Sequence, residues 1–516
     1  MYPKNNEKKL LGLLQMITNI IEYLKLDCKN APEKTAIFAG GGKSAYSFRE
    51  LDEKAQIIGT YLAKQGFFRQ PIIVMCSQNA QTLALFLGIT YSGNFYVPLD
   101  KDTPLDRLAL IISNSKAKVI LGQVQGIENL CGIKYASFED IISSGDIDKN
   151  LLESVLAKVT SNDPLYMVYT SGSTGIPKGV IKSHNSMINF IESYCDTFNF
   201  GDEVIANQTP FYFDASNKDI YLMLKLCSSL VIVPKELFMF PIKLIEYLNE
   251  QKVTYICWVP SALAIVSQLN AFKVVVPKYL KYVFFVGEVM QIKHLNNWRS
   301  VLPKVRFCNL YGQSEVAGVC CYYEIKRDFG LEEKLPIGKA FKNVEVFLVD
   351  ENGKKTTKGI GEICVRGNIL ANGYFGDSEK TNKVFINNPL TPEYQDRVLL
   401  SGDLAEYDSE GNLVYSSRKD FQIKHMGHRI ELMEIEVYAN AIDVVDCSCC
   451  HYDTKRNKIV LFFTKTKDIE NVEAYIVERL KEKLPNYMIP NRFVILDIMP
   501  KNNNGKIDRK KLKEMI

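Results

Sequence analysis

The sequence has little net charge and lacks an N-terminal segment apolar enough to cross a membrane. Its 63 lysines and arginines nearly balance 59 acidic residues, so the formal net charge is only +4, which gives no argument for nucleic-acid binding. Residues 10–26 have the apolar spacing of a helix, but polar side chains interrupt them and no small-residue cleavage site follows. They predict a docking helix rather than a membrane span or a secretion signal.

The sequence also lacks the paired spacing of a zinc site. Thirteen cysteines are scattered along 516 residues without a secretory signature, which favours reduced thiols and a cytoplasmic location. Cys447, Cys449, Cys450 and His451 form a single cluster, whereas zinc ligands usually come as C-x₂-C pairs. The cluster therefore favours a buried strand followed by a turn over a zinc site.

The stretch LYMVYTSGSTGIPKG at residues 165–179 fits neither of two common catalytic loops. A Walker A loop needs Gly five positions before Gly-Lys-Ser/Thr, and here Lys178 follows Pro177. A nucleophile elbow needs G-x-S-x-G, and Ser173 directly follows Gly172. Such a loop alone is most often a surface turn. However, a strand followed by backbone N–H groups, hydroxyls and one cation suits a polyphosphate, so this stretch is a candidate phosphate loop.

The length of the chain predicts two or more domains, because 516 residues are too many for one core. Strand-like runs at 71–75, 119–121, 230–233, 255–259 and 282–286 alternate with helical segments, which predicts a mostly parallel α/β sheet. Short strands and glycine turns over 344–365 suggest a small antiparallel barrel. The last ~100 residues read as a compact α+β domain, with strands at 459–464 and 493–496 and a helix at 472–484. We expect a domain of residues 1–419 and a second of 420–516.

Two helix starts can be predicted from local residues. A hairpin is expected over residues 35–46, and Ser47 with Glu50 forms a capping box that opens a helix through Leu62. Asn185 is expected to cap a helix across 187–195.

Further motifs follow in order along the chain. They are YSGNFYVPLD at 91–100, the candidate phosphate loop, FDAS at 213–216, NLYGQSE at 309–315, SGDL at 401–404, SRKDFQIK at 417–424, GHRIE at 427–431, LPNYMIP at 484–490 and NGKIDR at 504–509. Each is weak alone, but this many in this order is specific. The chain resembles the adenylate-forming superfamily over nearly its whole length. Within it, the chain is similar to the amino-acid-activating adenylation domains of nonribosomal peptide synthetases and to stand-alone D-alanine–carrier protein ligases.

The resemblance implies a fold and a first reaction. The fold is a large N-terminal domain of two α/β subdomains and a small β-barrel, followed by a mobile α+β C-terminal domain that acts as a lid. In the reaction, a carboxylate attacks the α-phosphorus of ATP to give an acyl-adenylate and pyrophosphate. Because two anions must meet, the site needs Mg²⁺ and a cation. By resemblance, Glu315 holds Mg²⁺ and Lys506 bridges the carboxylate and the α-phosphate.

The resemblance also implies the nucleotide ligands. The loop would bind the β- and γ-phosphates. Asn309 would hydrogen-bond the adenine amino group, and Tyr311 would stack on the adenine ring. Asp403 would accept hydrogen bonds from the ribose hydroxyls. The residues so implied are Thr170, Ser171, Gly172, Ser173, Thr174, Gly175, Lys178, Asn309, Tyr311, Asp403, Tyr415 and Arg418. The departures from the family pattern are conservative: Gln313-Ser314 stands for Pro-Thr, Ser401 for Thr, and Ser417-Arg418 for Gly-Arg.

A second half-reaction is expected, in which the adenylate passes to a thiol. By resemblance, the C-terminal domain rotates about Asp420 and Gly427 lines the thiol tunnel. The sequence has no carrier segment after Arg509 and no His-His condensation motif. We therefore expect the acceptor to be the phosphopantetheine arm of a carrier protein acting in trans, although coenzyme A offers the same thiol.

Asp214 is the expected partner of a substrate α-ammonium, since amino-acid activators have this aspartate and aryl- or fatty-acid activators generally lack it. The other residues that align with the specificity pocket are Ala215, Lys218, Cys257, Phe284, Val286, Leu310, Gly318 and Val319. Lys218 would favour an acidic or carbonyl-bearing side chain if it points inward; alternatively it pairs with Asp219 or faces solvent. Stereochemistry cannot be read, and D-alanine activation for teichoic acids stays open.

Two further functions compete with an amino-acid–carrier protein ligase. One is an acyl- or aryl-CoA ligase, against which Asp214 argues. The other is a degenerate nucleotide-binding protein, against which the presence of Lys506, Glu315 and Asp403 argues. ATP-dependent exchange with a panel of acids would separate them.

Overall fold

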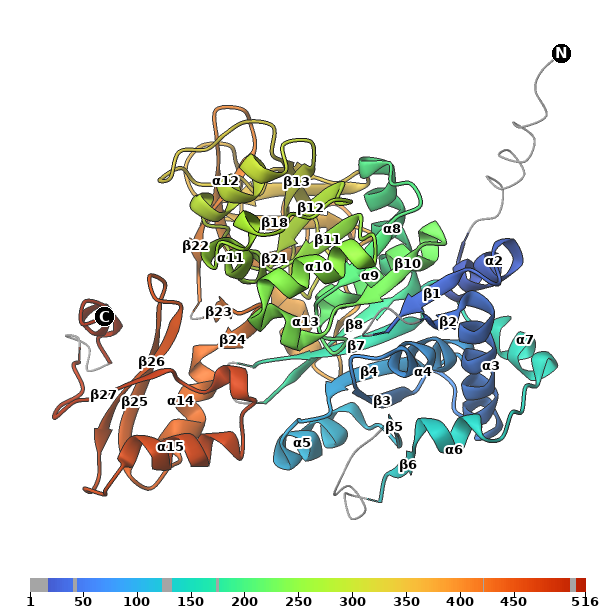
Figure 1. The fold of residues 1–516 in the computed structure, drawn as a ribbon. Coiled ribbons are helices and arrows are strands. Elements are labelled where there is room, and N and C mark those ends of the chain that lie inside the picture. The colour runs from blue at the N-terminus through green and yellow to red at the C-terminus, as the bar shows by residue number, and fades with distance from the viewer. Residues whose placement is uncertain (1–16, 40–43, 123–131, 173–175, 421, 502–506) are drawn as a thin grey trace.

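Two large sheets form most of the protein (Figure 1). The computed structural model describes residues 17–39, 44–122, 132–172, 176–420, 422–501 and 507–516. The first sheet has seven strands in the order β19-β8-β7-β4-β3-β5-β6. They are β3 (Pro71–Cys76), β4 (Phe95–Asp100), β5 (Val119–Gly122), β6 (Lys134–Ala136), β7 (Pro164–Thr170), β8 (Lys178–Ser183) and β19 (Gly373–Tyr374). Helices α3 (Phe48–Lys64), α4 (Ala80–Tyr91), α5 (Leu105–Ser115), α6 (Phe138–Ile142) and α7 (Lys149–Leu156) accompany it.

The second sheet has nine strands in the order β15-β14-β13-β12-β11-β9-β10-β1-β2. They are β1 (Thr35–Phe38), β2 (Ser44–Ser47), β9 (Val204–Asn207), β10 (Ser229–Ile232), β11 (Tyr255–Trp258), β12 (Tyr282–Val286), β13 (Arg306–Tyr311), β14 (Cys321–Glu324) and β15 (Lys339–Ala340). Its helices are α2 (Ile21–Asn30), α8 (His184–Phe198), α9 (Asp214–Leu226), α10 (Pro241–Glu250), α11 (Pro260–Gln268) and α12 (Ile292–Val301). The central strands of both sheets are parallel, which confirms the predicted α/β architecture.

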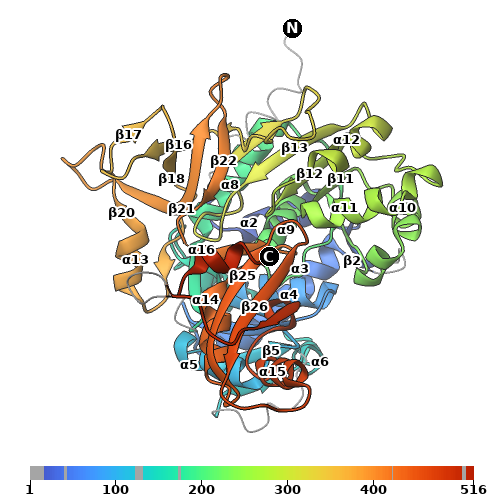
Figure 2. The same ribbon diagram turned by 90° about the vertical axis from the view of Figure 1, so that its left-hand side faces the viewer.

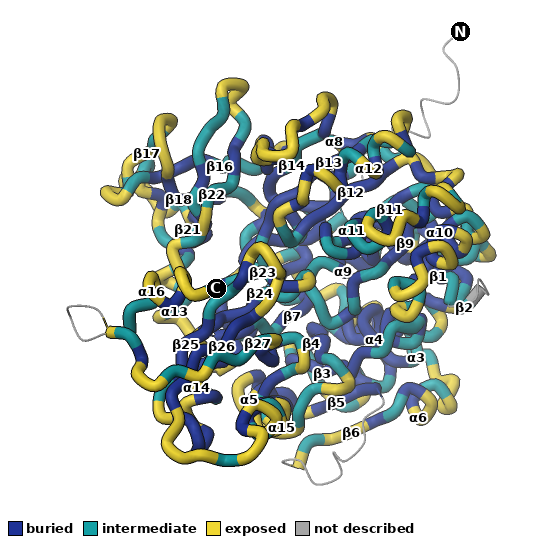
Figure 3. The backbone as a smooth tube through the Cα atoms, turned by 60° about the vertical axis from the view of Figure 1, so that its left-hand side comes forward, coloured by how far each residue is buried: buried dark blue, intermediate teal, exposed yellow. Residues whose placement is uncertain are grey.

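The strands are apolar because helices cover them. All six residues of β3, PIIVMC, are buried, as expected for a parallel strand with both faces covered. One hydrophobic cluster joins α3, α4, α8 and α9 to strands of both sheets, and a second lies on the other face of the nine-stranded sheet. Figure 3 shows these strands as a buried interior beneath exposed loops. The two sheets therefore share one continuous core.

A third sheet is antiparallel, and it confirms the predicted small barrel in the form of a half-barrel. Its six strands are β16 (Val344–Val349), β17 (Lys355–Thr356), β18 (Gly361–Gly367), β20 (Phe385–Asn387), β21 (Arg397–Tyr407) and β22 (Leu413–Arg418), with α13 (Ser378–Val384) beside them. β21 and β22 carry residues predicted to bind ribose, so this sheet supplies one wall of the candidate site.

The C-terminal region folds around its own hydrophobic clusters. A hairpin of β23 (Gln422–His425) and β24 (His428–Glu431) leads into α14 (Leu432–Asn440), followed by β25 (Val445–Asp453), β26 (Lys458–Lys465), α15 (Val472–Lys481), β27 (Arg492–Ile495) and α16 (Arg509–Lys513). Figure 2 looks onto this region, with β25 and β26 in front. The predicted strands and helix are present, and Cys449 and Cys450 lie buried in β25. The proposed boundary at residue 420 stays a prediction.

Local capping predictions were right at one helix and wrong at another. Ser47 and Glu50 form the capping box of α3, and β1 pairs with β2 as the predicted hairpin. Helix α8, however, is capped by Ser183, whose Oγ accepts from the Ser186 N–H. Asn185 lies inside the first turn, where its Oδ1 accepts from Asn189 Nδ2. Ser183 has the extended backbone that a cap requires, so the helix starts two residues earlier than expected.

The N-terminal docking helix predicted over 10–26 falls partly outside the described residues. The described helix α2 begins at Ile21, and Ile20, Ile21 and Leu24 are buried. The Ile20 N–H donates to Nδ1 of buried His184, 3.2 Å away, which ties α2 to α8. Within the described part of the chain, no helix has the length and apolar character that crossing a membrane requires.

Acidification should destabilise the protein through His184. Burial lowers its pKa to about 4 from 6.5, so the unfolded chain takes up the proton first. The stability that the neutral ring provides is complete above pH 6.5 and is lost as the pH falls toward 4. In His184→Asn, Oδ1 can still accept from Ile20 N–H but does not titrate. Urea unfolding at several pH values should show a shallower acid loss for the variant; equal slopes would contradict the assignment.

Candidate active site

The predicted site residues gather where strands of both sheets end. Thr170 ends β7, Val286 ends β12 and Tyr311 ends β13. The β23–β24 hairpin lies against these strand ends (Figure 1), and its Gly427 N–H donates to Glu288, which follows β12. The carboxyl edge of parallel strands is where ligands bind in open α/β sheets. Segments more than 250 residues apart in the chain therefore form one site.

Glu315, the predicted metal ligand, lies at the centre of a buried charge cluster. Arg429 Nη1, from β24, is 2.5 Å from Glu315 Oε2, and the Tyr374 hydroxyl donates to Oε1 at 2.7 Å. Lys178 Nζ is 4.0 Å from the same carboxylate and 3.8 Å from Glu431. Although burial alone would raise it, the pKa of Glu315 is lowered by the Arg429 and Lys178 charges. Glu315 is therefore an anion with cations on two sides.

Lys178 is the cation predicted to bind phosphate. Its side chain is 9% exposed, and its ammonium lies over the Tyr374 ring. Burial, together with the nearby Arg429 charge, lowers the pKa of Lys178 to about 8. A buried ammonium that lacks full compensation favours an added anion, which fits the predicted role.

The C-terminal region covers the described part of the phosphate loop. Ser171 Oγ donates to the Arg429 carbonyl and accepts from the Glu431 N–H, both at 3.0 Å. The Gly172 N–H donates to Glu434 Oε2 at 3.1 Å, and Glu434 pairs with Arg107 at 2.6 Å, both buried. A Cβ on Gly172 would lie 2.0 Å from the Ile176 carbonyl oxygen, so only glycine fits there. The Glu434 carboxylate and the Arg429 backbone carbonyl thus accept from Gly172 and Ser171, two donors that the resemblance assigns to phosphate.

Thr170 keeps a hydroxyl available for a ligand. Its Oγ1 is buried and has no hydrogen-bond partner among the described residues, which is costly unless a ligand or water satisfies it. Ser173, Thr174 and Gly175, also predicted to bind phosphate, lie outside the described residues.

The nucleoside side of the site is a chain of paired polar groups. The Tyr311 hydroxyl donates to Asp403 Oδ2 at 2.5 Å, and Arg418 Nη1 donates to Asp403 Oδ1 at 2.6 Å. Arg418 also makes a two-pronged contact with Asp420, the predicted hinge residue, at 2.6 and 2.8 Å. Burial contributes most to raising the pKa of Tyr311, so it stays a neutral donor. The structure thus joins the predicted adenine, ribose and hinge residues in one network.

Asn309 and Tyr415 are two further residues predicted to bind the nucleoside. Asn309 Nδ2 donates to the Pro336 carbonyl at 2.7 Å, which leaves Oδ1 as the acceptor that an adenine amino group requires. Lys424 Nζ lies 5.6 Å from the centre of the Tyr311 ring, the face predicted for adenine. Tyr415, from β22, is half-buried, and burial raises its pKa to about 12.

The hairpin tip requires a glycine at the predicted tunnel position. Gly427 has φ +81°, and a Cβ there would lie 2.9 Å from Val259 Cγ1. Its N–H donates to Glu288 Oε1 at 2.8 Å. The adjacent His428 ring stacks on Tyr487 with a centroid separation of 3.6 Å and meets the edge of Phe213. The tip therefore lies next to the residue that precedes Asp214.

Asp214 is already paired. Its Oδ2 lies 3.1 Å from Lys182 Nζ, and its Oδ1 accepts from the Tyr166 hydroxyl at 2.8 Å. Burial raises the pKa of Asp214, and the Lys182 charge and the Tyr166 hydrogen bond oppose that rise. Lys182 also donates to the Val316 carbonyl at 2.7 Å and is fully buried. The predicted contact of Asp214 with a substrate α-ammonium stays a prediction.

Lys218 pairs with its neighbour, which is one of the alternatives that the sequence left open. Its ammonium makes a short contact with Asp219, both side chains are buried, and Asp219 also accepts from Asn207. The apolar residues predicted to line the pocket lie together in one hydrophobic cluster: Cys257, Phe284, Val286, Leu310 and Val319. Ala215 follows Asp214 in α9, and Gly318 has φ +65° and packs tightly against Phe190. A Cβ on Gly318 would lie 2.4 Å from that ring.

Lys506, the predicted catalytic lysine, lies outside the described residues. Lys501 and Ile507, on either side of that segment, form a β-bridge, and Ile507 packs in the cluster with Cys449 and Leu512. Figures 1 and 2 show α16, which follows, on the face of the C-terminal region turned away from the two large sheets.

Sequence reasoning missed four charged residues of the site: Arg107, Lys182, Arg429 and Glu434. Lys182 had a usable signal, because in strand β8 it shares a face with buried Val180 and a lysine there must find a buried anion. Arg107 and Glu434 are 327 residues apart in the chain, and no local pattern pairs them.

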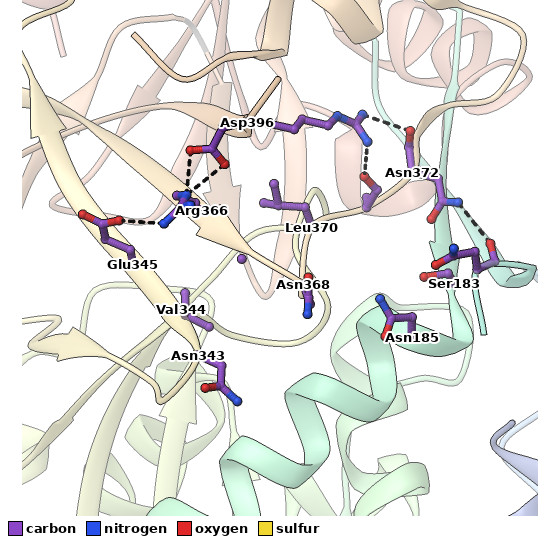
Figure 4. Close-up of a pocket in the computed structure, with 14 residues that line it drawn as sticks. Ser183, Asn185, Asn343, Val344, Glu345, Arg366, Asn368, Leu370, Asn372 and Asp396 are labelled. Carbon is purple, nitrogen blue, oxygen red and sulfur yellow. Dashed lines mark hydrogen bonds and ion pairs between the residues drawn. The ribbon is translucent and has the colours of Figure 1, made fainter. Parts of the chain in front are cut away.

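A cavity of about 750 Å³ lies outside the predicted site (Figure 4). It lies between β16, β18, the segment at 367–372 and the start of α8, and none of the predicted site residues lines it. Arg366 in its wall pairs with Asp396 and Glu345, and Arg397 donates to backbone carbonyls of Ala371 and Asn372. The Ala371 N–H also donates to the Glu315 carbonyl at 2.9 Å, so this wall contacts the backbone of the predicted metal ligand.

Comparison with known proteins gives a consistent result. A family model described as "AMP-binding enzyme" matches residues 24–375. Bacitracin synthase 1 of Bacillus licheniformis is 32% identical over 521 residues, covering 99% of this chain but only 9% of that protein. Zwittermicin A synthase ZmaJ of Bacillus cereus is 31% identical, with 96% of this chain and 95% of ZmaJ covered. The chain thus spans about a tenth of the first relative and nearly the whole of the second.

Solved structures share the fold. The structure of holo-PA1221, described as an NRPS protein containing adenylation and PCP domains bound to a vinylsulfonamide inhibitor, superposes with a TM-score of 0.82. It is 21% identical, and the match covers 96% of this chain and 84% of that chain. This similarity agrees with the mixed α/β fold described above.

Removing Arg107 should loosen the C-terminal region from the phosphate loop. Breaking a buried ion pair by removing one partner costs about 3–5 kcal/mol, because the remaining charge is uncompensated. In Arg107→Met, Glu434 is left buried, and the Gly172 N–H is the one hydrogen-bond donor that remains to it among the residues that the structure describes. We expect faster tryptic cleavage next to the predicted hinge, at Arg418 and Lys419. The double variant Arg107→Met/Glu434→Gln, which removes both charges, should regain protection. Wild-type resistance in the single variant would contradict this role.

Proposed function

The chain belongs to the AMP-binding enzyme family, and from this premise we propose that it activates an amino acid as an aminoacyl-adenylate and transfers it to the phosphopantetheine thiol of a separate carrier protein. Adenylation activity of the nonribosomal-peptide type follows from the family. The acid, the carrier and the transfer are our proposals, as is the cytoplasmic location that the free cysteines favour.

The observation that carries the proposal is the occupation of the phosphate loop by charged groups of the C-terminal region. Glu434 accepts from the Gly172 N–H, and Arg429 pairs with Glu315. The β- and γ-phosphates of ATP cannot bind at Gly172 while a carboxylate holds its N–H, since both are anions. On the other side of the site, Tyr311 and Asp403, which are predicted to bind the nucleoside, contact each other. This arrangement suits a step after pyrophosphate has left, when only the AMP moiety remains.

An enzyme with two half-reactions needs a second arrangement of the C-terminal region relative to the core. The predicted hinge at Asp420 supports such a second arrangement. In the proposed first step, the C-terminal region rotates about Asp420, withdraws Arg429 and Glu434, and brings Lys506 to the carboxylate and the α-phosphate. Asp420 is well suited to hold one arrangement, because its two contacts with Arg418 tie it to the ribose ligand Asp403. Motions of this size occur at a few residues between rigid elements.

The residues present fit a magnesium ion. Mg²⁺ in phosphoryl-transfer sites is held by one or two carboxylates together with phosphate oxygens and waters, not by a dense cluster of protein ligands. Glu315 supplies a buried carboxylate beside the loop, and the described residues hold no group of three or more His, Cys, Asp or Glu that could bind a metal. Glu315 would hold the ion once Arg429 withdraws. Bound Mg²⁺ neutralises phosphate charge, and Lys178 adds a second cation.

The proposed acceptor is a thiol that enters beside the hairpin tip. Gly427 lacks a side chain at the point where the hairpin meets Val259, and neutral His428 packs on Phe213 and Tyr487. ZmaJ, nearly fully covered by this chain, is named as a synthase of zwittermicin A, and PA1221 contains adenylation and PCP domains. These names support a carrier protein. D-Alanine–carrier protein ligation stays the first alternative, and coenzyme A ligation the second.

The proposed function predicts that the two half-reactions depend on different residues. Lys506→Ala should lower acid-dependent ATP–pyrophosphate exchange by about 100-fold or more, since a positioned charge on the transition state is lost. It should leave transfer from a preformed adenylate largely intact. Gly427→Ala should lower transfer from a preformed adenylate and leave exchange largely intact, because the alanine Cβ would clash with Val259. Equal loss of both reactions in either variant would contradict the two-arrangement proposal.

The first experiment is exchange with a panel of acids, followed by mass spectrometry of a phosphopantetheinylated carrier protein. D-Alanine, L-aspartate and L-glutamate belong in the panel. A carrier-bound product would support the proposed transfer, whereas a product on coenzyme A alone would support the second alternative. ATP binding without any exchange would overturn the proposed function.

A further inference from the structure

From the contacts at the tip of the β23–β24 hairpin we infer that Glu288 is a positioning residue for the proposed transfer step. Its carboxylate joins the core to the C-terminal region and holds Gly427 in place, next to the proposed path of the thiol. The inference rests on the proposed function. It adds a residue that belongs neither to the predicted nucleotide ligands nor to the predicted specificity pocket.

The position of Glu288 follows from two neighbouring strands. β11 and β12 are parallel neighbours in the nine-stranded sheet, so their carboxyl ends lie at the same edge. Glu288 comes just after β12, and helix α11 begins just after β11. The Glu288 side chain meets the start of that helix, where its Oε2 accepts from the Ser261 N–H at 2.9 Å.

One oxygen of Glu288 is therefore used within the core. The N-cap residue of α11 is Val259, which has no side-chain oxygen to cap the helix. The first N–H groups of a helix lack partners within the helix and favour a negative charge. Glu288 supplies that charge at Ser261. Because α11 packs in the core through Leu263 and Val266, this contact does not depend on where the C-terminal region lies.

The other oxygen of Glu288 is used by the hairpin, since Oε1 accepts from the Gly427 N–H at 2.8 Å. The turn has two central residues, Met426 and Gly427, with φ of +51° and +81°. His425 pairs with His428 on either side of them. In such a turn the hydrogen bond joins the outer residues, and the N–H of the second central residue is left out of it. The hairpin thus presents the Gly427 N–H to Glu288.

Only one of the two contacts breaks in the proposed cycle. Gly427 lies beyond Asp420, about which the C-terminal region is proposed to rotate, whereas Glu288 and Ser261 lie before it. Rotation would separate Glu288 Oε1 from Gly427 and would leave Oε2 on Ser261. Glu288 would then wait in the orientation that accepts the hairpin again, and a preorganised group loses less entropy when a contact forms.

The contact also lies where it can control access of a thiol. A Cβ on Gly427 would lie 2.9 Å from Val259 Cγ1, so the backbone of the hairpin tip packs directly on the start of α11. Met426 and Val289, the sequence neighbours of Gly427 and Glu288, are 64% and 73% exposed. The contact is therefore at the surface of the molecule, and its loss would let the tip move at the proposed entrance.

The test compares both half-reactions of the full chain after Glu288→Met, which keeps the length of the side chain and removes both acceptors. Acid-dependent ATP–pyrophosphate exchange should be little changed. Transfer from a preformed adenylate should fall about tenfold, the effect of one hydrogen bond to a charged group. The loss should be the same with a phosphopantetheinylated carrier protein and with free pantetheine. Unchanged transfer, an equal loss of exchange, or a loss confined to the carrier protein would overturn the inference.

A second substitution separates positioning of the hairpin from capping of α11. Val259 has the extended backbone of an N-cap residue, so Val259→Thr places a hydroxyl where it can accept from an N–H of the first turn. Glu288→Met/Val259→Thr should regain the stability to urea that Glu288→Met loses, while transfer stays about tenfold low. Recovery of transfer in the double variant would mean that Glu288 only caps α11, and would overturn the inference.

Hydrogen–deuterium exchange of the wild type keeps the inference testable where Glu288→Met does not fold or no acid supports ATP–pyrophosphate exchange. The probes are AMP, and the ATP analogue AMPPCP with Mg²⁺. The Gly427 amide should exchange about tenfold more slowly with AMP, because the phosphates of AMPPCP oppose the arrangement in which Gly427 donates to Glu288. Equal protection with both nucleotides would overturn the inference. Absence of ATP–pyrophosphate exchange with every acid would count against the proposed function, while this comparison still tests the Glu288 contact.

Discussion

The candidate site depends on one constraint: every carboxylate buried at the carboxyl edge of the two sheets needs a cation. Glu315 has Arg429, Asp403 has Arg418, Asp214 has Lys182, Asp219 has Lys218 and Glu434 has Arg107. An unpaired buried charge is far more costly than a paired one. The identity of each partner therefore decides which ligands and which domain arrangement the site accepts.

These pairs differ in what they connect. Lys182 and Lys218 belong to the same region of the chain as their partners and fix the pocket itself. Arg429–Glu315 and Arg107–Glu434 join the C-terminal region to the core. Because desolvation offsets most of the attraction within a buried pair, such contacts contribute little net stability and can be exchanged for others of the same charge. They suit a contact that must form and break in each cycle.

The sequence predicted what depends on neighbours in the chain. The apolar runs became the strands of the two sheets, Ser47 and Glu50 formed their capping box, and the pairing of Lys218 with adjacent Asp219 was among the alternatives considered. The motifs also marked Tyr311, Asp403 and Arg418, which the structure joins by hydrogen bonds. The cap of α8 was assigned to Asn185 because both it and Ser183 are good capping residues, and only the backbone angles distinguish them.

What could not be predicted depends on contacts across hundreds of residues. Nothing in the local sequence pairs Arg107 with Glu434, or shows that Arg429 reaches Glu315. Lys182 lies three residues after the motif at residues 165–179, and that motif drew attention to the loop and not to the strand that continues beyond it. Because side chains alternate between the two faces of β8, Lys182 could be predicted to point inward with Val180. Its partner, Asp214, could be identified only from the structure, since Asp214 belongs to α9.

The constraint also explains how the site can change arrangement while each position keeps an occupant of the same sign of charge. In the arrangement described here, the arginine at Glu315 takes the position proposed for Mg²⁺, and the carboxylate at Gly172 takes the position proposed for phosphate. A cation thus replaces a cation and an anion replaces an anion. In the proposed cycle, Arg429 would pair with Glu315 and Glu434 with the Gly172 N–H once the metal and phosphates were absent, so neither Glu315 nor Glu434 would remain buried without a partner. Under the proposed two-step function, the order of the half-reactions would follow from whether Glu434 and Arg429, or phosphate and Mg²⁺, occupy these positions.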